Sequence, residues 1–162
     1  MFELITSSLQ KAGYDRYEVS NFCLPEHKAL HNEAIWKNSH YAGLGPGAHG
    51  FLPNGYRTYQ PSDWLKWSTS SRPEIEIPSP QQQAIDAVLT WIRHRDGIPL
   101  DRLSQMGFHF SFKGLEPLLS ERYVKQQENS ILLAPKGWSV VDLITPTCLQ
   151  AKQNYLKLFF KK

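Results

Sequence analysis

The residues best suited to chemistry gather in the first third of the chain, where glycines lie close to a histidine. The run Gly45-Pro-Gly-Ala-His-Gly50 matches the pattern G-x-G-x-x-G, in which glycines let a backbone approach a dinucleotide closely. That use requires the run to open a helix whose N-terminus meets the pyrophosphate. Here Phe51-Leu-Pro-Asn-Gly55 follows instead, and these residues are typical of a turn. The sequence therefore indicates a close-approach glycine loop and speaks against a dinucleotide fingerprint.

Most of the histidines lie in the same region, which raises the question of a metal site. They are His27, His31, His40 and His49. Their spacings of four, nine and nine residues match no ligand helix, and no nearby pair of cysteines supports them. Histidines that form hydrogen bonds in loops are the simpler interpretation of this spacing.

Neither a thiol nor a serine nucleophile is indicated. Cys23 and Cys148 lie far apart, so they form neither a Cys-x-x-Cys motif nor a disulfide framework. A buried thiol without a catalytic role is the common case for such cysteines. The Gly-x-Ser-x-Gly elbow of hydrolases is absent from the sequence. These patterns assign no catalytic residue.

The composition is that of a soluble globular protein. The chain has 162 residues, of which 41% are hydrophobic and 20% charged, and its net charge is +3. No apolar run approaches the ~18 residues of a membrane helix and no signal segment opens the chain, so we expect a cytoplasmic protein without a membrane span. The mild positive charge permits the binding of anions or nucleic acid without arguing for it.

The first half of the chain predicts short elements that would carry these side chains. Phe2, Ile5 and Leu9 recur at helical spacing, and Gly13 stands where a helix typically ends. A helix, a short turn and a strand make half of an α/β unit. The expected elements are a helix over 2–12, a strand over 14–20, an irregular stretch over 21–40, strands at 41–45 and 56–59, and a short helix capped by Ser62 and Asp63.

A connector over residues 69–78 separates this half from a mainly helical second half. Ser79 followed by Pro80 is a typical helix start. The expected apolar face of that helix consists of Ile85, Val88, Leu89 and Ile92. Further expected elements are helices over 100–106 and 112–119, a hairpin over 123–127 and 131–134, and a last helix that ends near Pro146. Three helices followed by a hairpin are the order of a winged helix.

A winged helix could bind DNA, but the third helix and its surroundings offer few charges for that role. These charges are Lys113, Glu116, Glu121 and Arg122. They form no base-reading surface with phosphate anchors, so we expect no DNA binding. The alternative is a winged-helix module that binds nucleic acid or protein and carries an N-terminal extension. An α+β domain without a site is the simplest case.

Three motifs in order are more specific than any one of them. They are Tyr17-Glu-Val-Ser-Asn-Phe22, His31-Asn32 with Trp36, and Gly43-Leu-Gly-Pro-Gly-Ala-His49. Over residues 2–149 the chain resembles the oxygen-independent coproporphyrinogen III oxidases, and most closely the heme-chaperone branch of that radical S-adenosylmethionine (SAM) group. The resemblance implies the last helix and strands of a partial radical-SAM (β/α) barrel over 1–68. It also implies a linker over 69–78, a winged-helix-like, mainly helical domain with a hairpin over 79–149, and a tail over 150–162.

The resemblance further implies cofactors that this sequence does not anchor alone. The family holds a 4Fe-4S cluster through a Cys-x-x-x-Cys-x-x-Cys loop, and SAM binds the remaining iron. No such loop occurs in this chain. We therefore expect a C-terminal fragment whose missing N-terminal half carries the cluster, and which performs no radical chemistry alone. Heme or porphyrinogen and a heme-acceptor protein are the expected partners, and the motifs leave open whether the parent oxidises a porphyrinogen or carries heme.

Site residues also follow from the resemblance. The residues expected on the SAM side are Gly45, Gly47, Ala48 and His49. The family motif His-Asn-x-x-Tyr-Trp, associated with heme, is matched by His31, Asn32 and Trp36, with His31 as the candidate ligand of the heme iron. Ile35 stands at the tyrosine position of this motif, and Gly50 stands where a small hydroxyl residue is expected.

Overall fold

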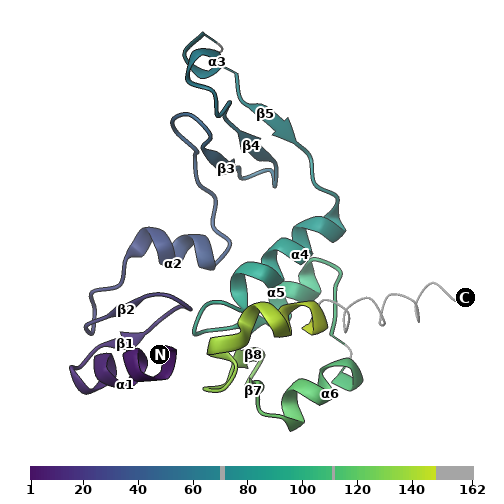
Figure 1. Ribbon diagram of the computed structural model, residues 1–162. Coiled ribbons are helices and arrows are strands. Elements are labelled where there is room, and N and C mark those ends of the chain that lie inside the picture. The colour runs from purple at the N-terminus through teal and green to yellow at the C-terminus, as the bar shows by residue number, and fades with distance from the viewer. Residues whose placement is uncertain (70–71, 111, 149–162) are drawn as a thin grey trace, which may run out of the picture.

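The computed structural model describes residues 1–69, 72–110 and 112–148, which form three parts (Figure 1). An N-terminal layer and one helix lie beside a mainly helical C-terminal unit, and a small sheet projects away from both. We call the described residues of this projecting segment, 41–69 and 72–77, the arm. In the part of the chain that the structure describes, no helix is long and apolar enough to cross a membrane.

The N-terminal layer consists of α1 (Phe2–Lys11), β1 (Asp15–Arg16) and β2 (Phe22–Cys23). The helix is the predicted one. The strand expected over 14–20 is shorter, because the chain turns back after Tyr17, whose N–H donates to the carbonyl of Asn21 at 3.3 Å. The strand then pairs antiparallel with β2.

Helix α2 (Leu30–Trp36) occupies part of the stretch that the sequence predicts to be irregular. Its start lacks a side-chain cap, so the usual sequence signal of a helix N-terminus is missing. Glu33 holds it in place instead, through ion pairs of 3.0 Å to both Lys28 and Lys37. The stretch expected to be irregular is therefore helical in part, and ion pairs of Glu33 stabilise this helix.

The arm is built around three antiparallel strands in the order β3 (His49–Phe51), β4 (Arg57–Tyr59) and β5 (Glu74–Glu76). Helix α3 (Trp64–Thr69) lies between β4 and β5 in the sequence, and Asp63 caps it as predicted by accepting the Lys66 N–H at 2.8 Å. The strand expected at 41–45 is reduced to one bridge, between Tyr41 and Phe51. The segment 69–78, expected as a linker, contains β5.

The C-terminal unit follows the predicted order of three helices and a hairpin. It contains α4 (Pro80–Trp91), β6 (Ile98–Pro99), α5 (Leu100–Gln105), α6 (Phe112–Ser120), β7 (Val124–Gln127), β8 (Ser130–Leu133) and the 3-10 turn η1 (Trp138–Val140), and residues 141–148 are helical. Ser79 caps α4, since its hydroxyl accepts the Gln82 N–H at 3.2 Å. The short strand β6, which the sequence did not predict, pairs with β8, and the last helix continues through Pro146.

Helix α4 supplies much of the core, but through a face rotated from the predicted one. Its buried residues are Ala84, Ala87, Val88 and Trp91. Ile85 and Leu89 are only half-buried. The predicted face was the one with the large apolar side chains. The buried face instead includes two alanines, whose small side chains let neighbouring elements pack close to the helix. The core also includes Ile92, Ile98, Leu103, Leu115 and Ile131, which are fully buried.

Candidate functional site

The glycine run closes on itself at the base of the arm. Tyr41 and Phe51 exchange two backbone hydrogen bonds, of 2.8 and 2.9 Å. A Cβ on Gly43 would lie 2.2 Å from the carbonyl oxygen of His49, and a Cβ on Gly50 would lie 2.4 Å from Thr58 Oγ1. No larger residue fits at these two positions unless its neighbours move, so both glycines serve the crossing of the chain.

Backbone hydrogen bonds hold the tip of the glycine run. Gly45 and Gly47 have φ angles of +99° and +70°, which favour glycine. The Gly47 N–H donates to the Pro61 carbonyl at 2.9 Å, and the Ala48 N–H donates to the Gly45 carbonyl at 3.2 Å. The N–H groups of Gly47 and Ala48 are thus already used within the chain and are not free to bind an anion.

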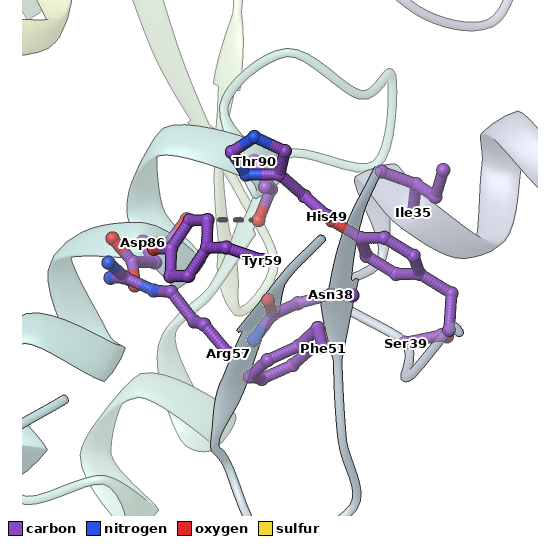
Figure 2. A pocket seen from close by; sticks show the side chains of 11 residues that line it. Ile35, Asn38, Ser39, His49, Phe51, Arg57, Tyr59, Asp86 and Thr90 are labelled. Carbon is purple, nitrogen blue, oxygen red and sulfur yellow. Dashed lines mark hydrogen bonds and ion pairs between the residues drawn. The ribbon is translucent and has the colours of Figure 1, made fainter. Parts of the chain in front are cut away.

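A pocket of about 200 Å³ lies between the arm, the end of α2 and α4 (Figure 2). Its floor is one face of the arm sheet, because the register places His49 opposite Tyr59 and Phe51 opposite Arg57. Directly opposite residues point to the same side of a sheet, and all four line the pocket. The other walls include Ile35, Asn38 and Ser39 after or within α2, and Asp86 and Thr90 of α4. We call this the arm pocket.

Charged side chains are organised around Arg57 in the arm pocket. Arg57 Nη1 lies 3.1 Å from Glu76 Oε2, and Nη2 pairs with the carboxylate of Asp86. Tyr59 donates its hydroxyl hydrogen to Glu76, which raises the pKa of Tyr59 and lowers the pKa of Glu76. One guanidinium thus faces two carboxylates, and these ion pairs tie the arm sheet to α4.

The imidazole of His49 is an accessible reactive group of the arm pocket. It stands edge-on to the ring of Tyr59, with ring centroids 4.7 Å apart and planes at 80°. His49 is exposed, and within the described residues its ring nitrogens make no hydrogen bond. Either nitrogen is therefore available to a ligand, as donor or as acceptor.

Helix α2 divides the second predicted motif between two faces. His31 and Ile35 are four residues apart, as are Asn32 and Trp36, so each pair shares a face and the two faces are ~100° apart. Ile35 lines the arm pocket, whereas Trp36 lines a separate pocket beside α4. His31 is exposed, and its ring has no hydrogen-bond partner in the described part of the chain.

Of the predicted site residues, only His49 lines the arm pocket. His49 lies with Ile35, the residue at the tyrosine position of the second motif, in the arm pocket. The lining of that pocket does not include Gly45, Gly47, Ala48, His31, Asn32 or Trp36.

The sequence does not predict two of the side chains that line the arm pocket. Arg57 and Asp86 are 29 residues apart, and no local pattern links them. A weak signal was present for Arg57 and Glu76: Arg-Thr-Tyr and Glu-Ile-Glu each alternate in the manner of strands, with opposite charges that a paired sheet would place together.

The described residues contain no cluster of side chains that could hold a metal ion by itself. Among them, no group of three or more His, Cys, Asp and Glu side chains is arranged to hold a metal ion. Cys23 and Cys148 are free and buried, and burial raises the pKa of the Cys148 thiol to about 11. A protonated, buried thiol is neither a ready ligand nor a nucleophile.

The fold has a close counterpart among solved structures. It superposes with a TM-score of 0.64 on the Escherichia coli structure titled "Coproporphyrinogen III oxidase (HemN) from Escherichia coli is a Radical SAM enzyme", covering 92% of this chain and 39% of that one. Sequence identity is 13%, so the similarity establishes the fold alone. The class defined in this way is a mixed α/β fold that matches part of a radical SAM enzyme.

Sequence similarity then identifies the relatives. The chain is 30% identical to the heme chaperone HemW of Lactococcus lactis over 148 residues, which are 86% of this chain and 39% of that protein. It is 27% identical to HemW of Mycobacterium tuberculosis over 155 residues, and 28% identical to the mitochondrial radical S-adenosyl methionine domain-containing protein 1 of Danio rerio over 182 residues. No protein-family model matches the chain. The chain is a homologue of the HemW heme chaperones and spans about two fifths of their length.

Proposed function

We propose that the chain is the C-terminal portion of a radical-SAM heme chaperone or coproporphyrinogen-oxidase-like protein. One observation carries this proposal: the homology covers 86% of the chain but 39% of the HemW relative. The lack of a Cys-x-x-x-Cys-x-x-Cys loop in the sequence is consistent with it. In this proposal residues 1–68 are the end of the barrel, residues 79–149 are a winged-helix-like domain, and the cluster is held by a missing N-terminal half. The cytoplasmic location stays a prediction.

The residues present do not fit a 4Fe-4S cluster. Such a cluster requires thiolate ligands, and the two cysteines are buried, with no further His, Cys, Asp or Glu around them in a ligand arrangement within the described residues. We therefore assign no radical step to this chain. Reconstitution with iron and sulfide should yield no cluster absorbance, and a stable 4Fe-4S spectrum would show that the chain is more than a cofactor-free fragment.

In this proposal the arm pocket would form part of a SAM site, with His49 as the one expected SAM-side residue that lines it. Its volume of about 200 Å³ lies below the ~300–1,000 Å³ of typical sites for drug-sized ligands. His49 would be the group presented to the cofactor, since its ring nitrogens have no other partner among the described residues. The Arg57 ion pairs would hold the sheet that carries His49 against α4.

His31 would supply an axial imidazole to heme iron. The exposed imidazole of His31 has no hydrogen-bond partner among the described residues, so it can turn toward a large planar ligand without the loss of such a bond. We would titrate the protein with heme and follow the Soret band in wild type and His31→Ala. His27→Ala is the matched control, because His27 is also exposed but its ring bonds the Pro25 carbonyl at 2.7 Å.

The expected result is a Soret shift in wild type and His27→Ala that is lost in His31→Ala. Equal spectra for all three proteins would rule out His31 as the ligand. For a chaperone, the bound heme would then pass to an acceptor protein, and for an oxidase the bound molecule would be a porphyrinogen.

A winged-helix binding module is the second candidate function. It is supported by the order α4, α5, α6, β7 and β8, and opposed by the sparse basic residues of α6. DNA binding that weakens steeply with salt would favour it, because phosphate contacts release counterions.

A further inference from the structure

Helix α2, which carries the candidate heme ligand His31, has no buried side chain. Leu30 at its start is 77% exposed, and the helix has seven residues and no side-chain cap. A helix of this length is marginal on its own in water. Its place in the fold therefore depends on contacts with other elements.

One carboxylate supplies such contacts at both ends of α2. Glu33 Oε1 accepts hydrogen bonds from Lys28 Nζ, before the helix, and from Lys37 Nζ, just after it, both at 3.0 Å. The same oxygen lies 3.7 Å from Nε2 of His94, which follows α4. Hydrogen bonds between charged groups are stronger than those between neutral groups. Glu33 thus ties the two flanks of α2 together and faces the end of α4.

A second carboxylate connects this cluster to the C-terminal unit. Asp96 Oδ2 lies 3.4 Å from Lys37 Nζ and 3.4 Å from His94 Nδ1. The His94 side chain is 2% exposed and the Glu33 side chain 15% exposed. Water screens charges at such sites only weakly, and the removal of one charge leaves its partners uncompensated. A network of charged side chains therefore holds α2 against the C-terminal unit.

The face of α2 that carries Glu33 is opposite to the face that carries His31. Two positions along an α-helix correspond to a rotation of ~200°, so side chains at this spacing point in nearly opposite directions. With Glu33 directed at His94, the imidazole of His31 is directed outward, where it is exposed. The contacts of Glu33 therefore also set the orientation of His31.

We propose that Glu33 is a positioning residue for heme ligation: its charged contacts hold α2 against the C-terminal unit, with His31 turned outward to meet the iron. This inference rests on the proposed ligation of heme by His31. Glu33 contacts neither heme nor iron and acts through the fraction of molecules in which α2 is docked. When only part of a protein population is competent to bind, the apparent affinity is reduced by that fraction.

Glu33→Gln tests the proposal, because it removes the charge and keeps the size of the side chain. Glu26→Gln is the matched control, since Glu26 is an exposed glutamate before α2 that forms no ion pair among the described residues. Glu33→Asp keeps the charge on a shorter side chain. Each variant of the full chain is compared with wild type by amide hydrogen exchange, which detects local opening, and by heme titration.

We expect the amides of residues 30–36 to lose most of their protection in Glu33→Gln, while those of residues 84–91 in the core helix α4 keep theirs. A docked fraction of about one tenth would weaken apparent heme binding about tenfold. At saturating heme the Soret maximum should equal that of wild type, because His31 is still present as the ligand. Glu33→Asp should lie between wild type and Glu33→Gln, and Glu26→Gln should match wild type in both measurements.

Three results would overturn the proposal. The first is unchanged exchange of residues 30–36 in Glu33→Gln. The second is heme binding of wild-type strength in a Glu33→Gln protein whose α2 has lost its protection. The third is an equal loss of protection in α4, which would make the effect one of global stability. Failure of the proposed heme ligation is recognised separately, because wild type and His31→Ala would then give the same heme titration, and the inference would fall with it whatever the exchange shows.

Discussion

Glu18 and His94 face each other across a single antiparallel bridge, and both are buried, at 0% and 2% exposure. Two backbone hydrogen bonds flank the bridge, from Val19 N–H to the Arg93 carbonyl and from Arg95 N–H to the Tyr17 carbonyl, at 3.0 and 2.9 Å. This pattern makes them a non-hydrogen-bonded pair, in which side chains approach most closely. The bridge joins the N-terminal layer to the end of α4.

The burial of His94 predicts that stability falls in mild acid. Burial lowers its pKa below 6.5, and among its charged neighbours Asp96 and Glu33 raise the pKa while Lys37 and Lys28 lower it. Because the unfolded chain takes up the proton first, stability is complete above pH ~6.5 and declines as pH falls below that value. The free energy of unfolding, measured with urea at pH 7.5 and 5.5, should be lower at pH 5.5.

His94→Gln provides the comparison for this pH effect. Its stability should be lower at pH 7.5 but should change less between the two pH values. Glu33 does not titrate in this window, because hydrogen bonds from Lys37 and Lys28 hold its pKa at about 2. A His94→Gln protein with the same pH slope as wild type would show that another group is responsible.

The glycine crossing predicts that alanine at Gly43 or Gly50 destabilises the arm. At each position the new Cβ would lie within 2.4 Å of a neighbouring atom. That atom is the carbonyl oxygen of His49 for Gly43 and the hydroxyl oxygen of Thr58 for Gly50. Overpacking of this kind costs typically ~1–3 kcal/mol. Leu44→Ala is the control within the same loop, because Leu44 is 87% exposed and its loss should be neutral. Chemical denaturation measures the free energy of unfolding of the two glycine variants and the Leu44→Ala control. Glycine variants as stable as wild type would contradict the close contacts at these two positions.

Removal of Arg57 should loosen the arm from α4. Arg57→Met leaves Glu76 and Asp86 without their shared cation, and breaking a partly buried ion pair should cost up to ~3 kcal/mol. Limited proteolysis should cut within the arm faster than in wild type. The double variant Arg57→Met, Asp86→Leu should regain part of the lost stability, since it contains one unpaired carboxylate fewer. Arg72→Ala removes a cation that forms no ion pair among the described residues, so its rate of cleavage should match that of wild type when the protease does not cut after arginine.

Neither cysteine should react with a thiol reagent while the protein is folded. Cys148 is fully buried and its pKa is raised to about 11, and Cys23 is 8% exposed. At pH 8 neither thiol should react with a disulfide reagent until denaturant is added, when both should react. Fast reaction of one thiol before unfolding would place that cysteine at the surface.

Local sequence signals predicted several elements correctly. Phe2, Ile5 and Leu9 marked α1, the Ser79-Pro80 pair marked the start of α4, and Asp63 marked the cap of α3. These signals succeed because caps and helical stripes depend on residues within a few positions of each other. Helix α2 escaped prediction because its start has no capping side chain. Strand β5 escaped because its three residues lie in a stretch rich in serine, proline and glutamate, which is typical of a connector.

By itself the sequence predicted a glycine loop in which the backbone approaches a neighbour closely, and three ordered motifs indicated the relationship to heme chaperones that the homology supports. The crossing at Gly43 and Gly50 became visible only in the structure. Only the tertiary structure decided which side chains share a pocket. It placed Ile35 beside His49 and Trp36 beside Trp91, because neighbours on one helix point in different directions. It likewise joined Arg57 to Asp86 and Glu18 to His94, since such contacts depend on how distant elements pack and not on any local pattern.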